Sequence, residues 1–187
     1  LLFSFFLIYN SPFYELTTSQ FNSLIFEIFI IITFLIFSTG LINFINFMDG
    51  IDGLVCSSFI PWLIVLGQLT SSNVYLGFSF CLIAFLIWNW QPAKIFMGDV
   101  GSLYLGSLLS ASLFQMSSYS NFFTLLMIIS PLILDPLTCL FMRYIYKHNI
   151  FSGHKLHLYQ RLIQNGFEHW HVSTIYFLTI CTLSYAY

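Results

Sequence analysis

The stretch NFMDGIDGL at residues 46–54 concentrates side chains that can bind a cation or a nucleotide. Asp49 and Asp52 are each followed by a glycine, and Asn43 and Asn46 lie just upstream. If the segment is helical, the two carboxylates share one face. The glycines then leave room for a ligand or another backbone to approach closely. A helix end capped by Asp and Gly is the alternative, but the doubled pattern with both asparagines favours a binding site.

A second polar motif, FMGDVGS, occupies residues 96–102 and places Asp99 between two glycines. An Asp at this position can cap the helix that follows. It can also bind Mg²⁺, which prefers one or two carboxylates together with water and substrate phosphates. With Asp49 and Asp52, Asp99 supplies such a site, for Mg²⁺ or for Mn²⁺ in its place. Phe96 is suited either to stacking on a planar ring or to the membrane interface.

The third motif, GHKLHLYQR, occupies residues 153–161. On a helix, His154 and His157 share a face and Arg161 follows one turn later. This stripe suits phosphate oxygens better than zinc, since no cysteine lies nearby to complete a zinc site. A surface helix lying on anionic lipid is the alternative. The remaining histidines are expected at the membrane interface: His148, His169 and His171.

Asp135 is an acidic residue inside an apolar run and is followed directly by Pro136. An acid within a membrane segment is a candidate functional residue. It can equally pair with Arg143 or with backbone groups freed by the prolines of this run. The sequence leaves both interpretations open.

The chain as a whole is too apolar for a water-soluble domain. Of its 187 residues, 58% are hydrophobic and 6% charged, whereas soluble domains carry roughly 25% charged residues. Its continuous apolar runs lack the alternation of a membrane β-barrel. We therefore expect an all-α, polytopic integral membrane bundle with about six spanning segments, the first one partial. Apolar runs occur at residues 1–8, 23–44, 54–69, 74–90, 102–116, 122–144 and 172–187.

The breaks between these runs predict which segments meet. Because successive spans reverse direction, residues 46–53, 91–101 and 146–171 fall on one side of the membrane. All five basic residues belong to that side, which the positive-inside rule makes cytoplasmic. A site at the membrane surface follows, and this placement disfavours a transporter, whose acids lie near the midplane.

The three motifs together resemble those of the polyprenyl-phosphate N-acetylhexosamine-1-phosphate transferases, glycosyltransferase family 4. The family pattern NxxNxxDGxDGL matches residues 43–54, FMGDxGS matches residues 96–102, and HxxHxYQRL matches residues 154–162. The last motif is more similar to the O-antigen branch than to the muramoyl branch. The match covers nearly the whole chain and aligns with roughly the C-terminal half of a family member.

This resemblance implies a reaction at a bacterial inner membrane, with an active site facing the cytoplasm. A UDP-N-acetylhexosamine gives its sugar-1-phosphate to undecaprenyl phosphate and releases UMP, with Mg²⁺ required. The implied pathway is a surface polysaccharide such as O-antigen, and no nucleic acid partner is expected. The resemblance assigns the following roles: Asp99 to Mg²⁺; Asp49 and Asp52 to active-site carboxylates; Asn43, Asn46 and Phe96 to substrate contacts; His154, His157 and Arg161 to the pyrophosphate or sugar; and Asp135 to a substrate contact.

One departure from the family pattern limits this expectation. The family has a further aspartate pair in an earlier cytoplasmic loop, whereas residues 1–45 contain no Asp. Residues 1–187 are therefore expected to form a single transmembrane catalytic domain lacking the N-terminal part of the family fold. The alternative function is a truncated, inactive remnant that only binds part of the substrate.

Overall fold

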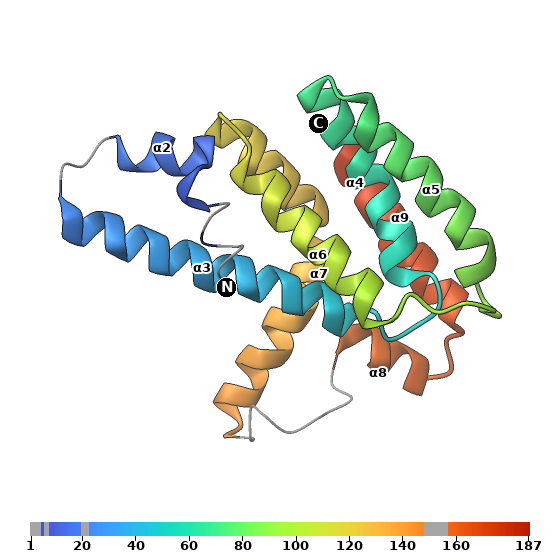
Figure 1. The fold of residues 1–187 in the computed structure, drawn as a ribbon. Coiled ribbons are helices and arrows are strands. Elements are labelled where there is room, and N and C mark those ends of the chain that lie inside the picture. Colours follow the sequence, from blue (N-terminus) through green and yellow to red (C-terminus); the bar gives the residue numbers. More distant parts are fainter. Residues whose placement is uncertain (1–4, 6–7, 20–22, 148–156) are drawn as a thin grey trace.

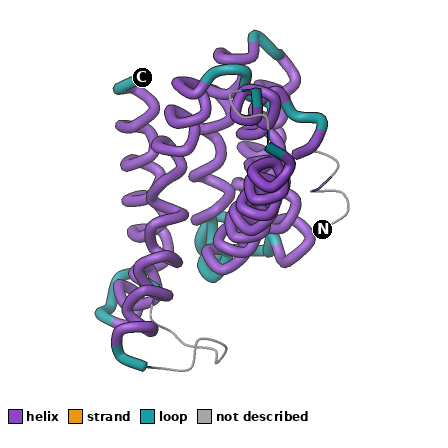
Figure 2. Tube along the Cα trace, turned by 90° about the vertical axis from the view of Figure 1, so that its left-hand side faces the viewer, coloured by secondary structure: helices purple, strands orange, loops and turns teal. Residues whose placement is uncertain are grey.

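A computed structural model describes residues 5, 8–19, 23–147 and 157–187. Every regular element in these ranges is a helix, which confirms the predicted all-α fold (Figures 1 and 2). The helices are α2 (Pro12–Thr18), α3 (Leu24–Met48), α4 (Leu54–Thr70), α5 (Asn73–Asn89), α6 (Gly98–Phe114), α7 (Tyr119–Ile145), α8 (Leu158–Gln164) and α9 (His169–Tyr185). All except the short α2 and α8 coincide with predicted apolar runs, with ends that differ by a few residues.

Helices α3 and α7 are the two described elements that are long and apolar enough to cross a membrane, with 25 and 27 residues. A spanning helix needs about 20 apolar residues, and the apolar helices α4 and α5 have 17 each. Large apolar side chains on α3 are exposed, including Ile25 at 81% and Ile36 at 69%. Exposed apolar side chains of this kind suit a helix in contact with lipid. The chain is an all-helical membrane protein, and its number of spans stays a prediction.

Helix α4 lies at the centre of the bundle. It packs against α5 on one side and α9 on the other, and it also contacts α7 (Figure 1). Phe59, Trp62 and Leu63 on this helix are completely buried. The Trp62 indole Nε1 donates a hydrogen bond to the Leu125 carbonyl of α7 at 3.0 Å. The largest core side chain therefore has its polar atom satisfied, as a buried indole requires.

Helices α3 and α6 form a close antiparallel pair. The Ser110 hydroxyl donates to the Ser38 hydroxyl at 2.7 Å in the buried interface. One turn further along, Gly106 lies against the backbone of Ile42, and a Cβ at Gly106 would come within 2.8 Å of the Ile42 Cα. The small residues let the two helices approach, so the C-terminus of α3 is held beside the N-terminus of α6.

Candidate active site

Three polar segments meet at one end of the bundle, as the alternation of helix directions predicts. The turn at residues 49–53 reaches the loop before α6, where the Ala93 N–H donates to the Asp52 Oδ2 at 3.2 Å. It also reaches the start of α9, where His169 Nδ1 lies 3.4 Å from the Asp52 Oδ1. Figure 1 shows these segments and α8 gathered at the same end. The side of the membrane on which this end lies stays a prediction.

Asp99, the second residue of α6, is held by α3. The Asn46 Nδ2 donates to the Asp99 Oδ1 at 3.1 Å and to the Ser102 hydroxyl at 2.8 Å. The Ser102 hydroxyl in turn donates to the Gly98 carbonyl at 3.0 Å. This contact lies one turn beyond the close approach of Gly106 to α3, so the same helix pair positions the carboxylate. Asn46 orients Asp99 through these hydrogen bonds. Its role as a substrate contact stays a prediction.

Asp49 lies directly after α3 and interacts electrostatically with Asp99. Burial raises the pKa of its carboxyl to about 6, the negative charge of Asp99 contributes in the same direction, and a hydrogen bond from the Gly98 backbone opposes the shift. Two carboxylates whose negative charges repel one another favour a cation between them. Of the three carboxylates that the sequence predicts to form one site, Asp49 and Asp99 interact in the structure.

The chemistry of this pair fits a hard divalent cation. Mg²⁺ binds one or two carboxylates and completes its octahedral shell with water and phosphate oxygens. Within the described part of the chain, no group of three or more His, Cys, Asp or Glu side chains is arranged to hold a metal. A site built on Asp49 and Asp99 therefore depends on oxygens that solvent or substrate supplies.

The segment that carries Asp49 and Asp52 is not helical, so the condition for the two carboxylates to share a helix face is not met, and Asp49 is the C-cap residue of α3. Helix α3 ends at Met48, and residues 49–53 form the turn into α4. Asp52 belongs to a different set of contacts, with His169 and with the Ala93 N–H. Its own backbone N–H lies 3.5 Å from the same His169 Nδ1. The turn thus directs the two aspartates to different partners.

The two glycines of the turn give room to protein side chains. A Cβ at Gly50 would overlap the hydroxyl of Tyr159, which reaches over from α8. At Gly53, which has a φ of +74°, a Cβ would come within 2.8 Å of the Trp90 ring. A left-handed backbone also favours glycine there. The close approach predicted at these glycines is therefore made by Tyr159 and Trp90.

Helix α8 carries the described part of the third motif. His157 is its N-cap residue and Arg161 lies one turn on, exposed to solvent. His154 lies outside the described residues. Tyr159 is 2% exposed and donates from its hydroxyl to the Phe47 carbonyl at 3.1 Å. Burial raises the pKa of Tyr159 to about 12, so its phenol keeps the proton that it donates.

Asp135 lies on α7 and is 5% exposed. Its carboxylate accepts hydrogen bonds from the backbone of α8 and from the Tyr176 hydroxyl of α9. The acid inside the apolar run is therefore a junction between three helices. Neither of the two interpretations taken from the sequence included these partners.

The two other predicted substrate contacts are not part of these networks. The Asn43 side chain is exposed and donates to the Thr39 carbonyl one turn earlier at 2.9 Å. Phe96 lies in the loop before α6 and is 73% exposed. Both residues border the same end of the bundle, and the structure gives them no contact with the aspartates among the described hydrogen bonds.

Sequence reasoning missed the polar side of α9. His169 was expected at the membrane interface, but it contacts Asp52. Ser173 donates to the Asp52 carbonyl at 2.7 Å, and Tyr176 donates to Asp135 at 2.8 Å. The spacing of four and three residues places these side chains on one helix face. That periodic polar stripe in an apolar helix is the signal that could have identified them.

Comparison with known proteins identifies the family to which the chain is similar. The family model described as Glycosyl transferase family 4 matches residues 1–117. A probable undecaprenyl-phosphate N-acetylglucosaminyl 1-phosphate transferase of Bacillus subtilis is 34% identical over 143 residues, covering 70% of this chain and 39% of the relative. A phospho-N-acetylmuramoyl-pentapeptide-transferase of Kosmotoga olearia is 48% identical over 77 residues, covering 39% of this chain and 24% of the relative.

A phospho-N-acetylmuramoyl-pentapeptide-transferase of Streptococcus pneumoniae is 43% identical over 91 residues. The match covers 45% of this chain and 28% of the relative. The chain thus spans at most about two fifths of the length of these relatives. The family match covers well over half of the chain and includes both the DGIDGL and the FMGDVGS motifs. The chain belongs to glycosyl transferase family 4.

Proposed function

We propose that this chain forms the nucleotide-sugar and metal side of an active site that transfers an N-acetylhexosamine-1-phosphate from a UDP-sugar to undecaprenyl phosphate. The observation that carries the proposal is the pair of carboxylates, Asp49 and Asp99, at the meeting point of α3 and α6. Membership of glycosyl transferase family 4 supports the same reaction class. The names of the relatives add the polyprenyl-phosphate acceptor.

Asp49 and Asp99 are the residues that would hold Mg²⁺, or Mn²⁺ in its place. A divalent cation at this position supplies charge neutralisation to the pyrophosphate of the donor. Asn46 orients Asp99 through its amide, and the Gly98 backbone holds Asp49. These contacts hold each carboxylate before substrate arrives, which reduces the reorganisation needed during the reaction.

Cationic side chains for the phosphates come from α7 and α8. A cavity of about 340 Å³ lies between these helices. Arg143, which is 8% exposed, and the exposed Arg161 both line it. Guanidinium groups bind phosphate oxygens in a bidentate manner. Arg161 was identified from its motif, whereas Arg143 becomes a candidate only because the fold brings it to the same cavity.

The reaction needs little proton transfer. An oxygen of the undecaprenyl phosphate forms a bond to the β-phosphorus of the UDP-sugar, and the bond from that phosphorus to the bridging oxygen breaks. UMP leaves with the electron pair, and the lipid pyrophosphoryl sugar remains. The second pKa of a phosphate monoester is about 6, so the attacking oxygen is largely ionised at neutral pH. Positioning and charge neutralisation therefore account for most of the required catalysis.

The proposal also covers location and pathway. The acceptor is a membrane lipid, so a site at one end of a helical bundle suits the reaction. We place this end at the cytoplasmic face of a bacterial inner membrane, because the basic residues gather there. The product would serve a surface polysaccharide such as O-antigen.

The test is a transfer assay with the full chain in membranes. Release of UMP is measured with UDP-N-acetylglucosamine, undecaprenyl phosphate and Mg²⁺, and again with a chelator. Asp99→Asn is expected to lower turnover on the order of 100-fold or more, as loss of a transition-state contact does. Glu27→Gln, which removes a carboxylate from the first turn of α3 at the opposite end of that helix, is the matched control and should keep its activity.

Two outcomes contradict parts of the proposal. Turnover that Asp99→Asn leaves intact would exclude this residue as the metal ligand. A wild-type chain that binds the UDP-sugar but releases no UMP would support the alternative, a remnant that only binds part of the substrate.

A further inference from the structure

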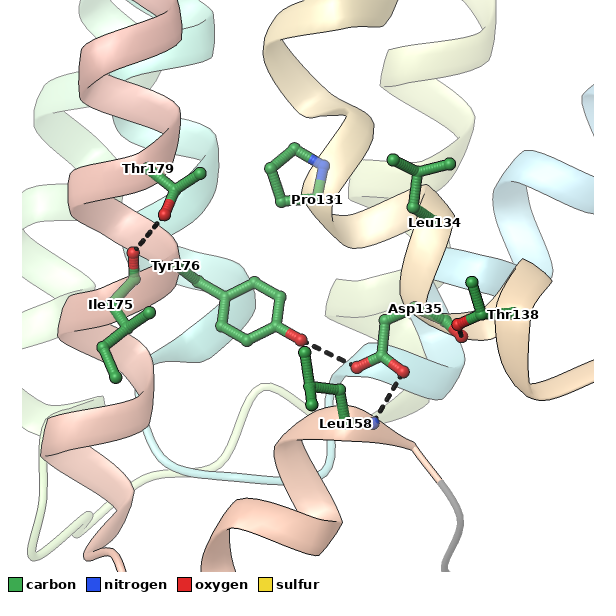
Figure 3. A pocket seen from close by; sticks show the side chains of 8 residues that line it. All are labelled: Pro131, Leu134, Asp135, Thr138, Leu158, Ile175, Tyr176 and Thr179. Carbon is green, nitrogen blue, oxygen red and sulfur yellow. Dashed lines mark hydrogen bonds between the residues drawn. The ribbon is translucent and has the colours of Figure 1, made fainter.

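Asp135 lies in the wall of a largely apolar cavity, where a bare carboxylate would be unfavourable. The cavity has a volume of about 300 Å³ and is lined by residues of α7, α8 and α9, among them Pro131, Leu134 and Ile175 (Figure 3). An isolated charge in such apolar surroundings is costly unless it is paired and hydrogen-bonded. The structure therefore poses the question of what this acid does.

The carboxylate of Asp135 is occupied by protein donors. Its Oδ1 accepts from the Leu158 N–H at 2.8 Å, and its Oδ2 accepts from the Tyr159 N–H at 3.3 Å. The Tyr176 hydroxyl of α9 also donates to Oδ2, at 2.8 Å (Figure 3). The His157 Nδ1 lies 3.4 Å from Oδ1. The donors come from two other helices, so the acid joins α7, α8 and α9 at one point.

Helix α8 has particular need of this support. It has only 7 residues, and isolated helices shorter than about 12 residues are marginal in water. The first N–H groups of a helix have no partner within it. Asp135 accepts from the first two, those of Leu158 and Tyr159. Its negative charge also lies at the positive end of the helix dipole.

The position of α8 matters because of what it carries. Tyr159 reaches from α8 over Gly50 to the Phe47 carbonyl, and thus contacts the turn that holds the aspartates. Arg161 lies one turn after His157 on the same helix. A displacement of α8 would therefore move a cationic group and loosen the packing against the turn.

We infer that Asp135, supported by the Tyr176 hydroxyl, is a positioning residue that anchors α8 and so fixes Arg161 in the proposed active site. This replaces the substrate-contact role that family resemblance implies for Asp135. The consequence for catalysis rests on the proposed function, whereas the anchoring of α8 does not. Tyr176 contributes to this anchoring indirectly, because its hydroxyl orients the Asp135 carboxylate.

The test is hydrogen–deuterium exchange of the peptide containing α8, measured on the full chain in detergent or nanodiscs. Asp135→Asn keeps the shape of the side chain but has one acceptor oxygen in place of two, and its NH₂ faces backbone donors. We expect exchange in α8 to rise on the order of tenfold or more, as loss of hydrogen bonds to a charged group implies. Tyr176→Phe keeps the carboxylate, and a smaller rise of a few-fold is expected.

Thr179→Val is the matched control for the cavity wall. Thr179 lines the same cavity, and its hydroxyl donates to the Ile175 carbonyl of its own helix at 2.8 Å. Exchange in α8 should stay at the wild-type level in this variant. An equal rise in Thr179→Val and Asp135→Asn would show a general disturbance of the cavity and contradict the inference.

Activity separates anchoring from direct substrate contact. If Asp135→Asn lowers turnover while α8 stays as protected as in the wild type, Asp135 acts on the substrate and the inference is wrong. If Asp135→Asn fails to fold, Tyr176→Phe decides, and wild-type protection of α8 in that variant overturns the anchor. If the wild type shows no transfer at all but exchange in α8 rises in Asp135→Asn, the anchoring role of Asp135 is supported and the proposed function is contradicted.

Discussion

Replacing Asp49 by Asn is expected to stabilise the metal-free protein at neutral pH. The pKa of this carboxyl is raised from 3.8 to about 6 by burial and by the nearby charge of Asp99. A raised carboxyl pKa means that the folded state prefers the neutral form. Asn has nearly the same shape, stays neutral at every pH, and keeps an oxygen that can accept from the Gly98 N–H.

The size of this stabilisation follows from the rise in the pKa of Asp49. A rise of roughly two pKa units corresponds to about 3 kcal/mol at about 1.4 kcal/mol per unit. Because Asp49 is only partly buried, solvent screening reduces this to about 1–2 kcal/mol. For a chain of this size, one kcal/mol changes the Tm by about 2–4 °C. The Asp49→Asn variant is therefore expected to melt about 2–8 °C higher than the wild type in the presence of a chelator.

The difference in stability between Asp49→Asn and the wild type depends on pH. Below the unfolded pKa of 3.8, Asp49 is protonated in both states and the variant should have no advantage. As pH rises from 3.8 to about 6, the unfolded chain ionises Asp49 while the folded wild type keeps it protonated, so the stability of the wild type falls relative to the variant and levels off above that range. A thermal melt followed by tryptophan fluorescence below pH 3.8 and at neutral pH measures both limits.

Addition of Mg²⁺ completes the experiment. A ligand that binds only the folded state stabilises it by RT ln(1 + [L]/Kd), which is about 2.7 kcal/mol at 100 times the Kd. Mg²⁺ should raise the Tm of the wild type and have much less effect on Asp49→Asn. Glu27→Gln, at the other end of α3, is the control and should lose at most a few tenths of a kcal/mol, because an acid at a helix N-terminus is mildly favourable. A variant less stable than the wild type at neutral pH without metal would refute the reasoning.

Further predictions concern the turn after α3. Gly50→Ala should cost about 1–3 kcal/mol of unfolding free energy, since its Cβ would overlap the Tyr159 hydroxyl; Gly40→Ala, which meets nothing within 4 Å, should be neutral or stabilising in the same denaturation experiment. His169→Ala should lower turnover by removing the side chain 3.4 Å from the Asp52 carboxylate, and His169→Gln should recover part of it. Equal activity in the wild type, His169→Ala and His169→Gln would show that the contact between His169 and Asp52 does not position Asp52.

The class of fold, and the end of the bundle where the chemistry gathers, could be predicted from the order of residues alone. Apolar runs of spanning length can satisfy their backbone only as helices in lipid, so α3 and α7 were predictable. Because helices alternate in direction, the motifs at Asp49, Asp99 and His157 had to share one end. The motifs also identified the carboxylates on which the proposed metal site depends.

Which polar groups meet became apparent only from the packed helices. Asp49 and Asp52 are three residues apart, but the turn directs them to different partners, Asp99 and His169. Asn46 meets Asp99 across 53 positions of sequence. Asp135 was ambiguous because its donors lie on α8 and α9. Contacts at such separations depend on how whole helices pack, and packing is set by the combined shape of many apolar side chains that no local pattern specifies.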